Sequence, residues 1–291
     1  MAKLILDDVT LHYQQLGQGE DLILVHGLGT NLAFWYLGIA SELSKHYRVL
    51  TYDLRGHGDS SMPASGFTLE RMAQDLQALL DHLDIRRPHI VGHSFGARVA
   101  LHYTLSNPHK VTTLTIADTL LKCLQLPPKL KDWFYWDTWK QQLQQHSDAL
   151  PNDDEIVDFR LLTCLNQISS GVTQGDLSRS PRSPSLKRRD MGRKGASRWE
   201  KLLTTTTANQ ELDDQGKITV QEIQSLKVPT LAIYGEYSHC LPSCFQLQEL
   251  LENCQVFIVP EVGHFHPAIK PALFVQTLQD FLDSHLNQIK P

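Results

Sequence analysis

The sequence predicts an α/β fold with a mostly parallel, eight-stranded sheet flanked by helices, on three observations. Short apolar runs alternate with segments of helical periodicity over residues 1–119 and again over residues 227–291. Residues 22–25 are continuously apolar, which is typical of a central parallel strand buried on both faces. Residues 92–96 place a Gly-x-Ser-x-Gly turn between a strand and a helix. Strands that alternate with helices form parallel sheets with right-handed crossovers, so the chain should wind around one such sheet.

Each strand is predicted from a short apolar or β-branched run. Residues 3–15 should form two short strands that turn at Asp7 and Asp8, ahead of the apolar run at 22–25. The other strands are expected at residues 47–52, 89–91, 111–118, 229–235 and 255–259.

Helices fill the intervals between the strands. The clearest spans residues 69–83, where the apolar side chains fall on one face and Thr68 stands where an N-cap is expected. Pro271 opens the last helix, because proline is tolerated in the first turn. Further helices are expected over residues 33–43, 97–103 and 242–251.

The alternation of strands and helices stops at Leu120 and resumes at Val228. An insertion at this point follows the carboxyl end of the sixth strand, the edge of the sheet where a site would lie. Residues 120–226 are therefore predicted to form a helical cap, with residues 1–119 and 227–291 as the core domain. The aromatic residues between 133 and 139 fit the core of such a cap better than a substrate platform.

Composition limits the classes of partner and compartment. The 291-residue chain is 41% hydrophobic and 20% charged, with a net charge of −5 that argues against nucleic acid as a partner. Its five cysteines are scattered without metal-type spacing, which indicates reduced thiols and a cytoplasmic protein. The first residues lack the apolar core of a signal peptide, and no later run is long enough for stable membrane insertion.

Ser94, at the centre of Gly92-His93-Ser94-Phe95-Gly96, is the candidate nucleophile. A Gly-x-Ser-x-Gly turn from a strand into a helix is a nucleophile elbow, which lifts the serine hydroxyl above the sheet edge. The turn is strained, so glycine is needed wherever a Cβ would collide with neighbouring backbone.

His264 is the candidate general base, because it lies just after the last predicted strand and downstream of the nucleophile. The chain order of nucleophile, acid and histidine is the one that accompanies this elbow. His266 is two residues further on and is the less favoured alternative. A neutral imidazole takes the serine proton and later returns it to the leaving group.

The backbone amides of Leu28 and Phe95 are the candidate oxyanion donors. Leu28 lies in the turn after the third strand, and Phe95 directly follows the nucleophile. His26 and His93 are expected to be structural residues, and so is the turn at residues 55–58.

Four motifs in this order resemble the large family of small α/β-hydrolases, in particular its lipase/esterase, enol-lactonase and meta-cleavage-product hydrolase branch. The resemblance covers roughly residues 1–120 and 227–291 and implies a cofactor-free serine hydrolase without a metal, but no particular substrate. The motifs are His26-Gly27-Leu28-Gly29, the segment 53–60, Gly92-His93-Ser94-Phe95-Gly96 and Val262-Gly263-His264.

The chain departs from the family pattern at the acid of the triad. Relatives commonly carry an aspartate three residues after the glycine that ends the seventh strand, and here that position holds Ser238. Asp118, at the end of the sixth strand, is the preferred replacement, and some members of the fold resemble this layout. Glu236 is the alternative acid, and a site without a carboxylate is the third possibility.

A basic segment at residues 178–201 lies within the predicted cap. It has two interpretations, a solvated loop or a patch for the anionic handle of an acyl substrate, such as a carrier protein, coenzyme A or a membrane surface. Only Asp190 and Glu200 oppose its nine basic residues: Arg179, Arg182, Lys187, Arg188, Arg189, Arg193, Lys194, Arg198 and Lys201.

The function predicted from these residues is hydrolysis of an ester, thioester or lactone through a Ser94 acyl-enzyme, with His264 as general base. Two alternatives stay open at this point. One is carbon–carbon bond hydrolysis or a lyase step on the same scaffold. The other is a non-catalytic ligand-binding homologue, for which the unusual acid position is the argument.

Overall fold

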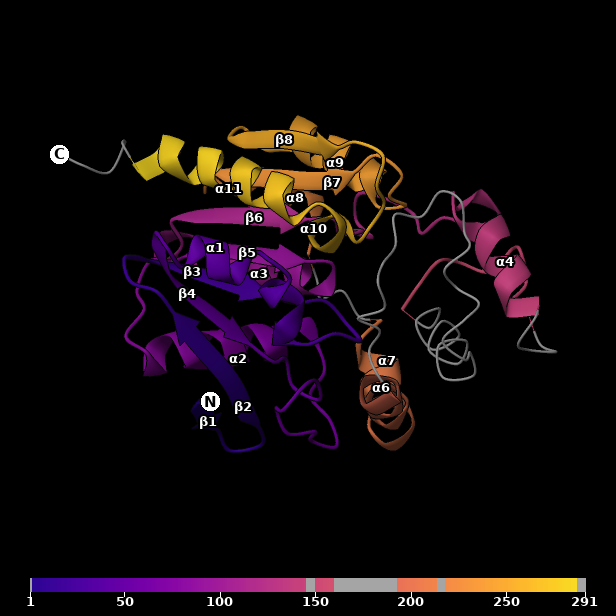
Figure 1. The fold of residues 1–291 in the computed structure, drawn as a ribbon, viewed down its shortest axis with the longest axis horizontal. Coiled ribbons are helices and arrows are strands. Elements are labelled where there is room, and N and C mark those ends of the chain that lie inside the picture. The colour runs from indigo at the N-terminus through magenta and orange to yellow at the C-terminus, as the bar shows by residue number, and fades with distance from the viewer. Residues whose placement is uncertain (1, 145–149, 160–192, 214–217, 287–291) are drawn as a thin grey trace.

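The computed structural model describes residues 2–144, 150–159, 193–213 and 218–286. Within them, eight strands form one sheet in the order β1-β2-β4-β3-β5-β6-β7-β8 (Figure 1). β1 and β2 pair antiparallel, β2 pairs antiparallel with β4, and all other neighbouring strands are parallel. The strands are β1 (Ala2–Ile5), β2 (Thr10–Leu16), β3 (Glu20–Val25), β4 (Tyr47–Tyr52), β5 (His89–His93), β6 (Thr113–Ala117), β7 (Thr230–Gly235) and β8 (Cys254–Val259).

The apolar run of β3 is buried on both faces, as its sequence predicts. Ile23 and Val25 pack into the core on one face of the sheet, while Leu22 and Leu24 pack into the core on the other. Successive side chains of a strand point to opposite faces, so a strand covered on both sides has no position left for a polar residue. The predicted fold class is confirmed.

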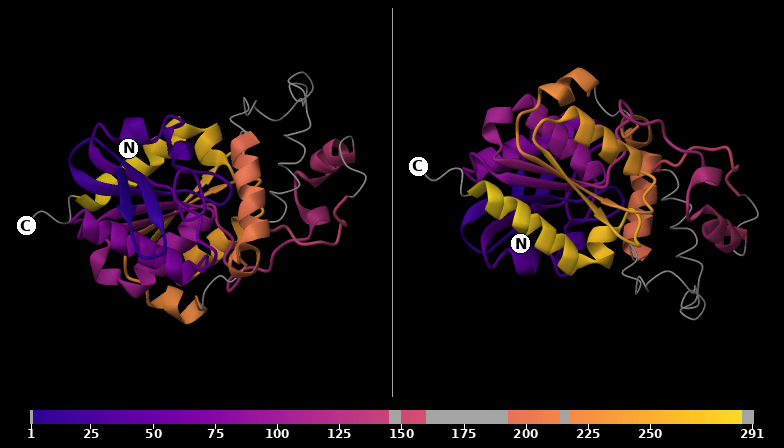
Figure 2. Two further views of the ribbon diagram at one scale, coloured as in Figure 1. Left: turned by 90° about the horizontal axis from the view of Figure 1, so that it is seen from below. Right: turned by 90° about the horizontal axis from the view of Figure 1, so that it is seen from above.

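Helices cover the two faces of the sheet (Figures 1 and 2). Apolar residues of α2 (Leu69–His82), α3 (Phe95–Ser106) and α9 (Leu241–Leu250) belong to one core, and those of α1 (Ala40–Leu43) and α11 (Pro271–Leu286) to the other. Thr68 caps α2 as expected, its hydroxyl accepting a hydrogen bond from the Arg71 amide. No helix in the described ranges has both the length and the apolar character needed to cross a membrane. The short elements are η1 (Leu32–Tyr36), η2 (Pro108–Lys110) and α10 (His266–Ile269).

The single helix predicted over residues 33–43 is wrong in its continuity. The segment divides into η1 and α1, with Gly38 between them at a φ of 95°. A right-handed helix cannot pass through a residue in this conformation, and glycine adopts it readily because it has no Cβ.

Most described parts of the insertion after β6 lie at the carboxyl ends of the parallel strands, whereas residues 220–225 flank the sheet and lead into the start of β7. Figures 1 and 2 show α4 and α6 beyond this edge of the sheet. Leu130, Trp136, Leu143 and Val157 form a small core of their own, with Trp133 and Trp139 packed against it. The elements here are η3 (Leu130–Asp132), α4 (Trp136–Gln144), α6 (Arg193–Thr205), α7 (Ala208–Glu211) and α8 (Val220–Ser225).

Candidate active site

Ser94 occupies a sharp turn between the end of β5 and the start of α3. Its backbone has φ 56° and ψ −121°, a region that costs free energy for a residue with a side chain. A Cβ on Gly92 would lie 2.4 Å from Ala97 Cα, and a Cβ on Gly96 would lie 2.4 Å from the Val25 carbonyl oxygen. Both glycines of the motif are therefore required by close backbone contacts, as expected from the sequence.

Asp118 leaves the neighbouring strand at the same edge of the sheet. The Ser94 amide donates to the Ala117 carbonyl over 2.9 Å, and the Asp118 amide donates to the Ile233 carbonyl over 3.0 Å. These bonds extend the parallel ladder by one residue beyond β5 and β6. Asp118 has a φ of 53°, so it too leaves its strand through a left-handed conformation.

Ser94, His264 and Asp118 form a continuous hydrogen-bonded chain. His264 Nε2 lies 2.9 Å from Ser94 Oγ, and His264 Nδ1 lies 2.7 Å from Asp118 Oδ1. A carboxylate can only accept, so Nδ1 carries the proton and Nε2 is free to accept from the serine hydroxyl. The Asp118 side chain is fully buried, whereas 18% of the His264 side chain is exposed at the opening of the site.

Two further donors hold the Asp118 carboxylate. Ser238 Oγ donates to Oδ1 over 2.5 Å, and the Gly235 amide donates to Oδ2 over 2.8 Å. Burial by itself would raise the pKa of the Asp118 carboxyl, but the hydrogen bond and charge of His264 outweigh it and hold that pKa well below its usual value. Asp118 is thus an anion with three donors. Ser238, at the position where the family resemblance leads one to expect an acid, instead donates to the carboxylate of Asp118.

Glu236 does not reach this group. It is exposed, and its carboxylate accepts a hydrogen bond from the Glu261 amide over 2.7 Å, in the turn after β8. Its side chain is tied to that turn and not to His264.

The other two histidines near the site hold its loops. His93 Nε2 lies 2.9 Å from the carbonyl oxygen of His264, and His266 Nε2 lies 3.1 Å from that of Ile233. Burial lowers the pKa of His266 to about 4 and that of His93 well below its usual value, so both rings are neutral donors to carbonyl groups. Sequence reasoning missed that His93 fixes the backbone of the residue that carries the base.

One candidate oxyanion donor lies directly after Ser94, and the other lies in the turn that packs on the elbow. Phe95 is the first residue of α3, where a helix has amides without an intrahelical acceptor. The turn that contains Leu28 packs closely on the elbow, since a Cβ on Gly27 would lie 3.0 Å from Ser94 Cβ. His26 holds this turn from below: its Nε2 accepts from the Leu54 amide over 3.0 Å, and its Nδ1 donates to the Gly27 carbonyl over 2.7 Å.

Arg55 ties the turn at residues 55–58 to the scaffold, in agreement with its sequence interpretation, while residues 56–58 also line a cavity beside α6. The Arg55 side chain has no exposed surface and forms a two-pronged ion pair with Asp75, through Nε at 2.7 Å and Nη2 at 2.6 Å. A third bond, of 3.0 Å, joins Nη1 to Asp8. A planar guanidinium with carboxylates on both sides ties the turn to α2 and to the first hairpin.

Buried neutral histidines make the fold sensitive to mild acid. Burial lowers the pKa of His57 to about 3 and that of His266 to about 4, whereas an unfolded chain has values near 6.5. Between these values the unfolded state binds more protons, so the free energy of unfolding should fall as the pH drops below about 6.5, by up to roughly 1.4 kcal/mol per pH unit for each histidine. Urea denaturation at pH 7.5, 6.5 and 5.5 checks this. A midpoint that does not change over this range would contradict it.

Comparisons with known proteins identify the family of the chain. The model of a family described as "alpha/beta hydrolase fold" matches residues 22–284. A pimeloyl-[acyl-carrier protein] methyl ester esterase of Vibrio cholerae is 29% identical over 94% of this chain and 98% of its own. A 2-hydroxy-6-oxo-2,4-heptadienoate hydrolase of Pseudomonas putida is 23% identical over 94% and 92%.

Solved structures show the same fold. The enol-lactonase of Burkholderia xenovorans superimposes with a TM-score of 0.66 at 20% identity, over 97% of this chain and 100% of that one. A thermophilic esterase of Thermogutta terrifontis gives a TM-score of 0.66 at 19% identity, over 98% and 99%. The chain therefore belongs to the α/β-hydrolase family and is a hydrolase on that scaffold.

Proposed function

We propose that the protein is a serine hydrolase that cleaves an ester, thioester or lactone through an acyl-enzyme on Ser94. The observation that supports this most directly is the chain of hydrogen bonds from Ser94 Oγ to His264 Nε2 and from His264 Nδ1 to Asp118 Oδ1. Nucleophile, base and orienting carboxylate lie at bonding distances with the tautomer that the reaction needs.

The reaction follows from the positions of these groups. Ser94 Oγ attacks the acyl carbonyl while His264 Nε2 takes its proton, and the Leu28 and Phe95 amides stabilise the resulting oxyanion. Collapse of the tetrahedral intermediate expels the alcohol, thiol or ring oxygen, which receives the proton from His264. Water activated by His264 then attacks the acyl-enzyme and regenerates Ser94. Asp118 stays ionised throughout and stabilises the imidazolium that forms twice in the cycle.

The same geometry bears on the alternatives. A protein that only binds a ligand does not need a buried carboxylate hydrogen-bonded to this histidine. The distance of 2.7 Å between Asp118 Oδ1 and His264 Nδ1 therefore favours an enzyme. In the described residues no feature favours carbon–carbon bond cleavage over ester cleavage. Ester hydrolysis is therefore the proposal, and the cytoplasmic location stays a prediction.

We infer that residues 120–226 act as a cap over this site. The Trp133 ring meets the His239 ring edge-on at 6.3 Å, and the Phe134 ring stacks on Tyr237 at 4.6 Å. Tyr135 approaches the backbone beside the base, where a Cβ on Gly263 would lie 2.7 Å from its ring. The substrate would thus enter between aromatic side chains of the insertion and the loops after β7 and β8.

A cavity of about 190 Å³ lies between α6 and the turn that contains Leu28. Arg198 reaches it from α6 and also donates to the carbonyl groups of Gly56 and Ser60, which joins the insertion to the core. The cavity is the proposed place for a polar end of the substrate. Its lining residues are Gly29, Thr30, Asn31, Gly56, His57, Gly58, Asp59, Gly195, Arg198, Trp199 and Leu202.

The basic segment is proposed to recruit an anionic handle on the substrate. Of its nine cations, the structure describes the side chains of Arg198 and exposed Lys201 and places the backbone of Arg193 and Lys194 in α6, while the other five lie outside the described residues. The Vibrio cholerae relative is named for an ester on an acyl-carrier protein. Such a substrate carries phosphate and carboxylate charge.

Replacing Arg188, Arg189 and Arg193 together by serine should raise KM for an ester or thioester with an anionic handle, with little change for a neutral ester. The expected loss arises from long-range attraction, so raising the ionic strength should have the same effect on the unaltered enzyme. Steady-state kinetics with a matched pair of charged and neutral esters measures it. Equal effects on both esters would identify the segment as a solvated loop.

The central proposal is tested with an activated short acyl ester and a serine-reactive phosphonate. A burst of the leaving group equal to the enzyme concentration should precede steady turnover. The phosphonate adduct should map to the peptide that contains Ser94 by mass spectrometry. Absence of both the burst and the adduct would contradict an acyl-enzyme mechanism.

A further inference from the structure

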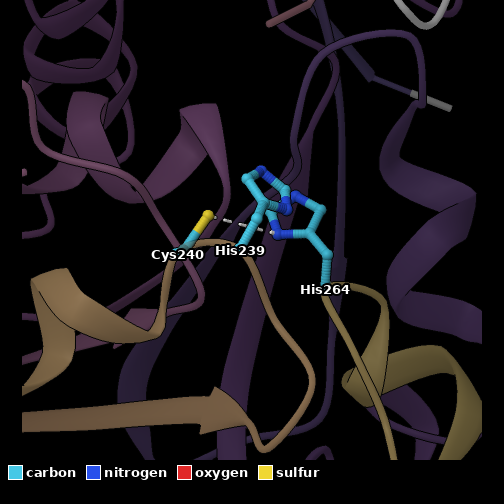
Figure 3. A group of neighbouring side chains, drawn as sticks. All are labelled: His239, Cys240 and His264. Carbon is cyan, nitrogen blue, oxygen red and sulfur yellow. Dashed lines mark hydrogen bonds between the residues drawn. The ribbon is translucent and has the colours of Figure 1, made fainter. Parts of the chain in front are cut away.

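We propose that His239, Cys240 and His264 form an inhibitory binding site for a thiophilic divalent cation such as Zn²⁺. In the part of the chain that the structure describes, these side chains make up one group of potential metal ligands, with candidate ligand atoms all within 4.8 Å of one another. Figure 3 shows both imidazole rings and the sulfur turned toward a common point. His239 and Cys240 come from the start of α9, and His264 from the loop after β8.

The spacing of the donors suits a tetrahedral ion. Cys240 Sγ lies 3.8 Å from His264 Nδ1. Zinc binds sulfur at about 2.3 Å and imidazole nitrogen at about 2.0–2.1 Å, which at a tetrahedral angle separates the two donors by about 3.6 Å. The spacing of Cys240 and His264 is thus close to a coordinating arrangement. The third donor must approach by about 1 Å, and Asp118 Oδ1, which accepts from His264 Nδ1 over 2.7 Å, must shift to face the ion. A thiolate with two imidazoles is a donor set that selects zinc over hard cations such as Mg²⁺.

His239 provides the independent observation. Its Nδ1 is buried and has no hydrogen-bond partner among the described residues. Its ring lies 5.2 Å from that of His264, and a neutral imidazole keeps one nitrogen lone pair that can bind a metal. A buried nitrogen without a partner is costly in a native fold, and a metal ion would satisfy it.

The local charges are compatible with a dication. Asp118 is a buried anion 2.7 Å from His264 Nδ1, and it favours a cation at this place. The ligating form of Cys240 is the thiolate, so the metal takes the place of the thiol proton. Each zinc bound therefore releases one thiol proton to solvent.

The consequence for the proposed reaction follows from the tautomer of His264. The Nδ1 proton, which faces Asp118, must first leave. The lone pair that this exposes on Nδ1 then binds the metal. The ring of a neutral imidazole keeps one proton, which then resides on Nε2. Nε2 can no longer accept the proton of Ser94, so hydrolysis stops while the ion is bound. This step rests on the proposed function, whereas metal binding itself does not.

Zinc inhibition of the chelator-treated, full-length enzyme tests the site. Buffered free Zn²⁺ should inhibit hydrolysis of a neutral short ester, and added chelator should restore the rate. Cys240→Ala and His239→Phe should each raise the half-inhibitory zinc concentration by at least about tenfold, because even loss of an outer-shell partner costs about 10- to 100-fold in metal affinity. Each variant is compared with its own metal-free rate. Cys244→Ala, which removes a buried thiol one turn along α9, is the matched control and should be inhibited like the unaltered enzyme.

Cobalt binding supplies a readout that does not need hydrolysis. Co²⁺ should produce a thiolate-to-metal charge-transfer band in the unaltered protein and in Cys244→Ala, but not in Cys240→Ala. Absence of the band in the unaltered protein, or its persistence in Cys240→Ala, would overturn the site. Equal zinc inhibition of all variants would do the same. If the protein hydrolysed no ester, the cobalt band would still decide whether the site exists.

Discussion

Replacing Ser94 by alanine should lower turnover of an activated short ester by about 10⁶-fold, as loss of the nucleophile does in other serine hydrolases. The substitution removes the one oxygen that lies 2.9 Å from His264 Nε2. Both residues have a Cβ, so the strain of the turn at φ 56° is unchanged and the fold should persist. Steady-state kinetics measures the loss, and thermal unfolding shows that the variant is folded.

Two controls make the Ser94 experiment decisive. The variant should also fail to react with the phosphonate, and His264→Ala should lower turnover by a comparable factor because the pair acts as a unit. Turnover near that of the unaltered enzyme in Ser94→Ala would refute the acyl-enzyme mechanism.

Replacing Asp118 by asparagine should lower turnover by about 10⁴-fold, by analogy with the same change in other triads. The amide keeps the shape of the carboxylate but can donate a hydrogen bond. His264 Nδ1 can then accept, which places the proton on Nε2, where the base must be free. The loss should appear in kcat, since the substrate does not contact a side chain with no exposed surface.

Glu236→Gln is the matched control for the acid and should cost far less, because the Glu236 carboxylate is exposed and bonded to the Glu261 amide. A stricter test moves the carboxylate from position 118 to position 238. Ser238 Oγ lies 2.5 Å from Asp118 Oδ1, so a carboxylate introduced by Ser238→Asp should recover part of the activity lost in Asp118→Asn. A loss in Glu236→Gln as large as that in Asp118→Asn would show that the acid is assigned wrongly.

The substitutions at Asp118 and Ser238 also test whether the acid of the triad can be carried by either β6 or β7. The ends of β6 and β7 are neighbours in a parallel ladder, about 5 Å apart. An aspartate side chain spans much of that distance. The loop after β8, which carries His264, should reach a carboxylate at the end of either strand after a small shift. The exchange keeps one anion in the same volume and replaces the serine hydroxyl by an amide.

The sequence by itself determines the strands, the elbow and the position of the base, because each follows from local rules. The contacts that force glycine at positions 92 and 96 arise from the turn itself and the strand beside it, so the motif specifies its own geometry. A short continuous apolar run between turn residues favours a strand covered on both faces, as β3 is. His264 follows the last strand directly, and the end of a parallel strand fixes which edge of the sheet it occupies.

Which of Asp118 and Glu236 contacts His264 is visible only in three dimensions. Both acids sit near carboxyl ends of neighbouring strands, and the sequence does not give the direction of either side chain. A left-handed φ of 53° turns Asp118 into the interior, where Ser238 and Gly235 donate to it, while the turn after β8 holds Glu236 outward. Tertiary structure likewise brings Cys240 next to His264, a contact between side chains 24 positions apart. Such contacts depend on loop geometry and on partners distant along the chain, which no local periodicity encodes.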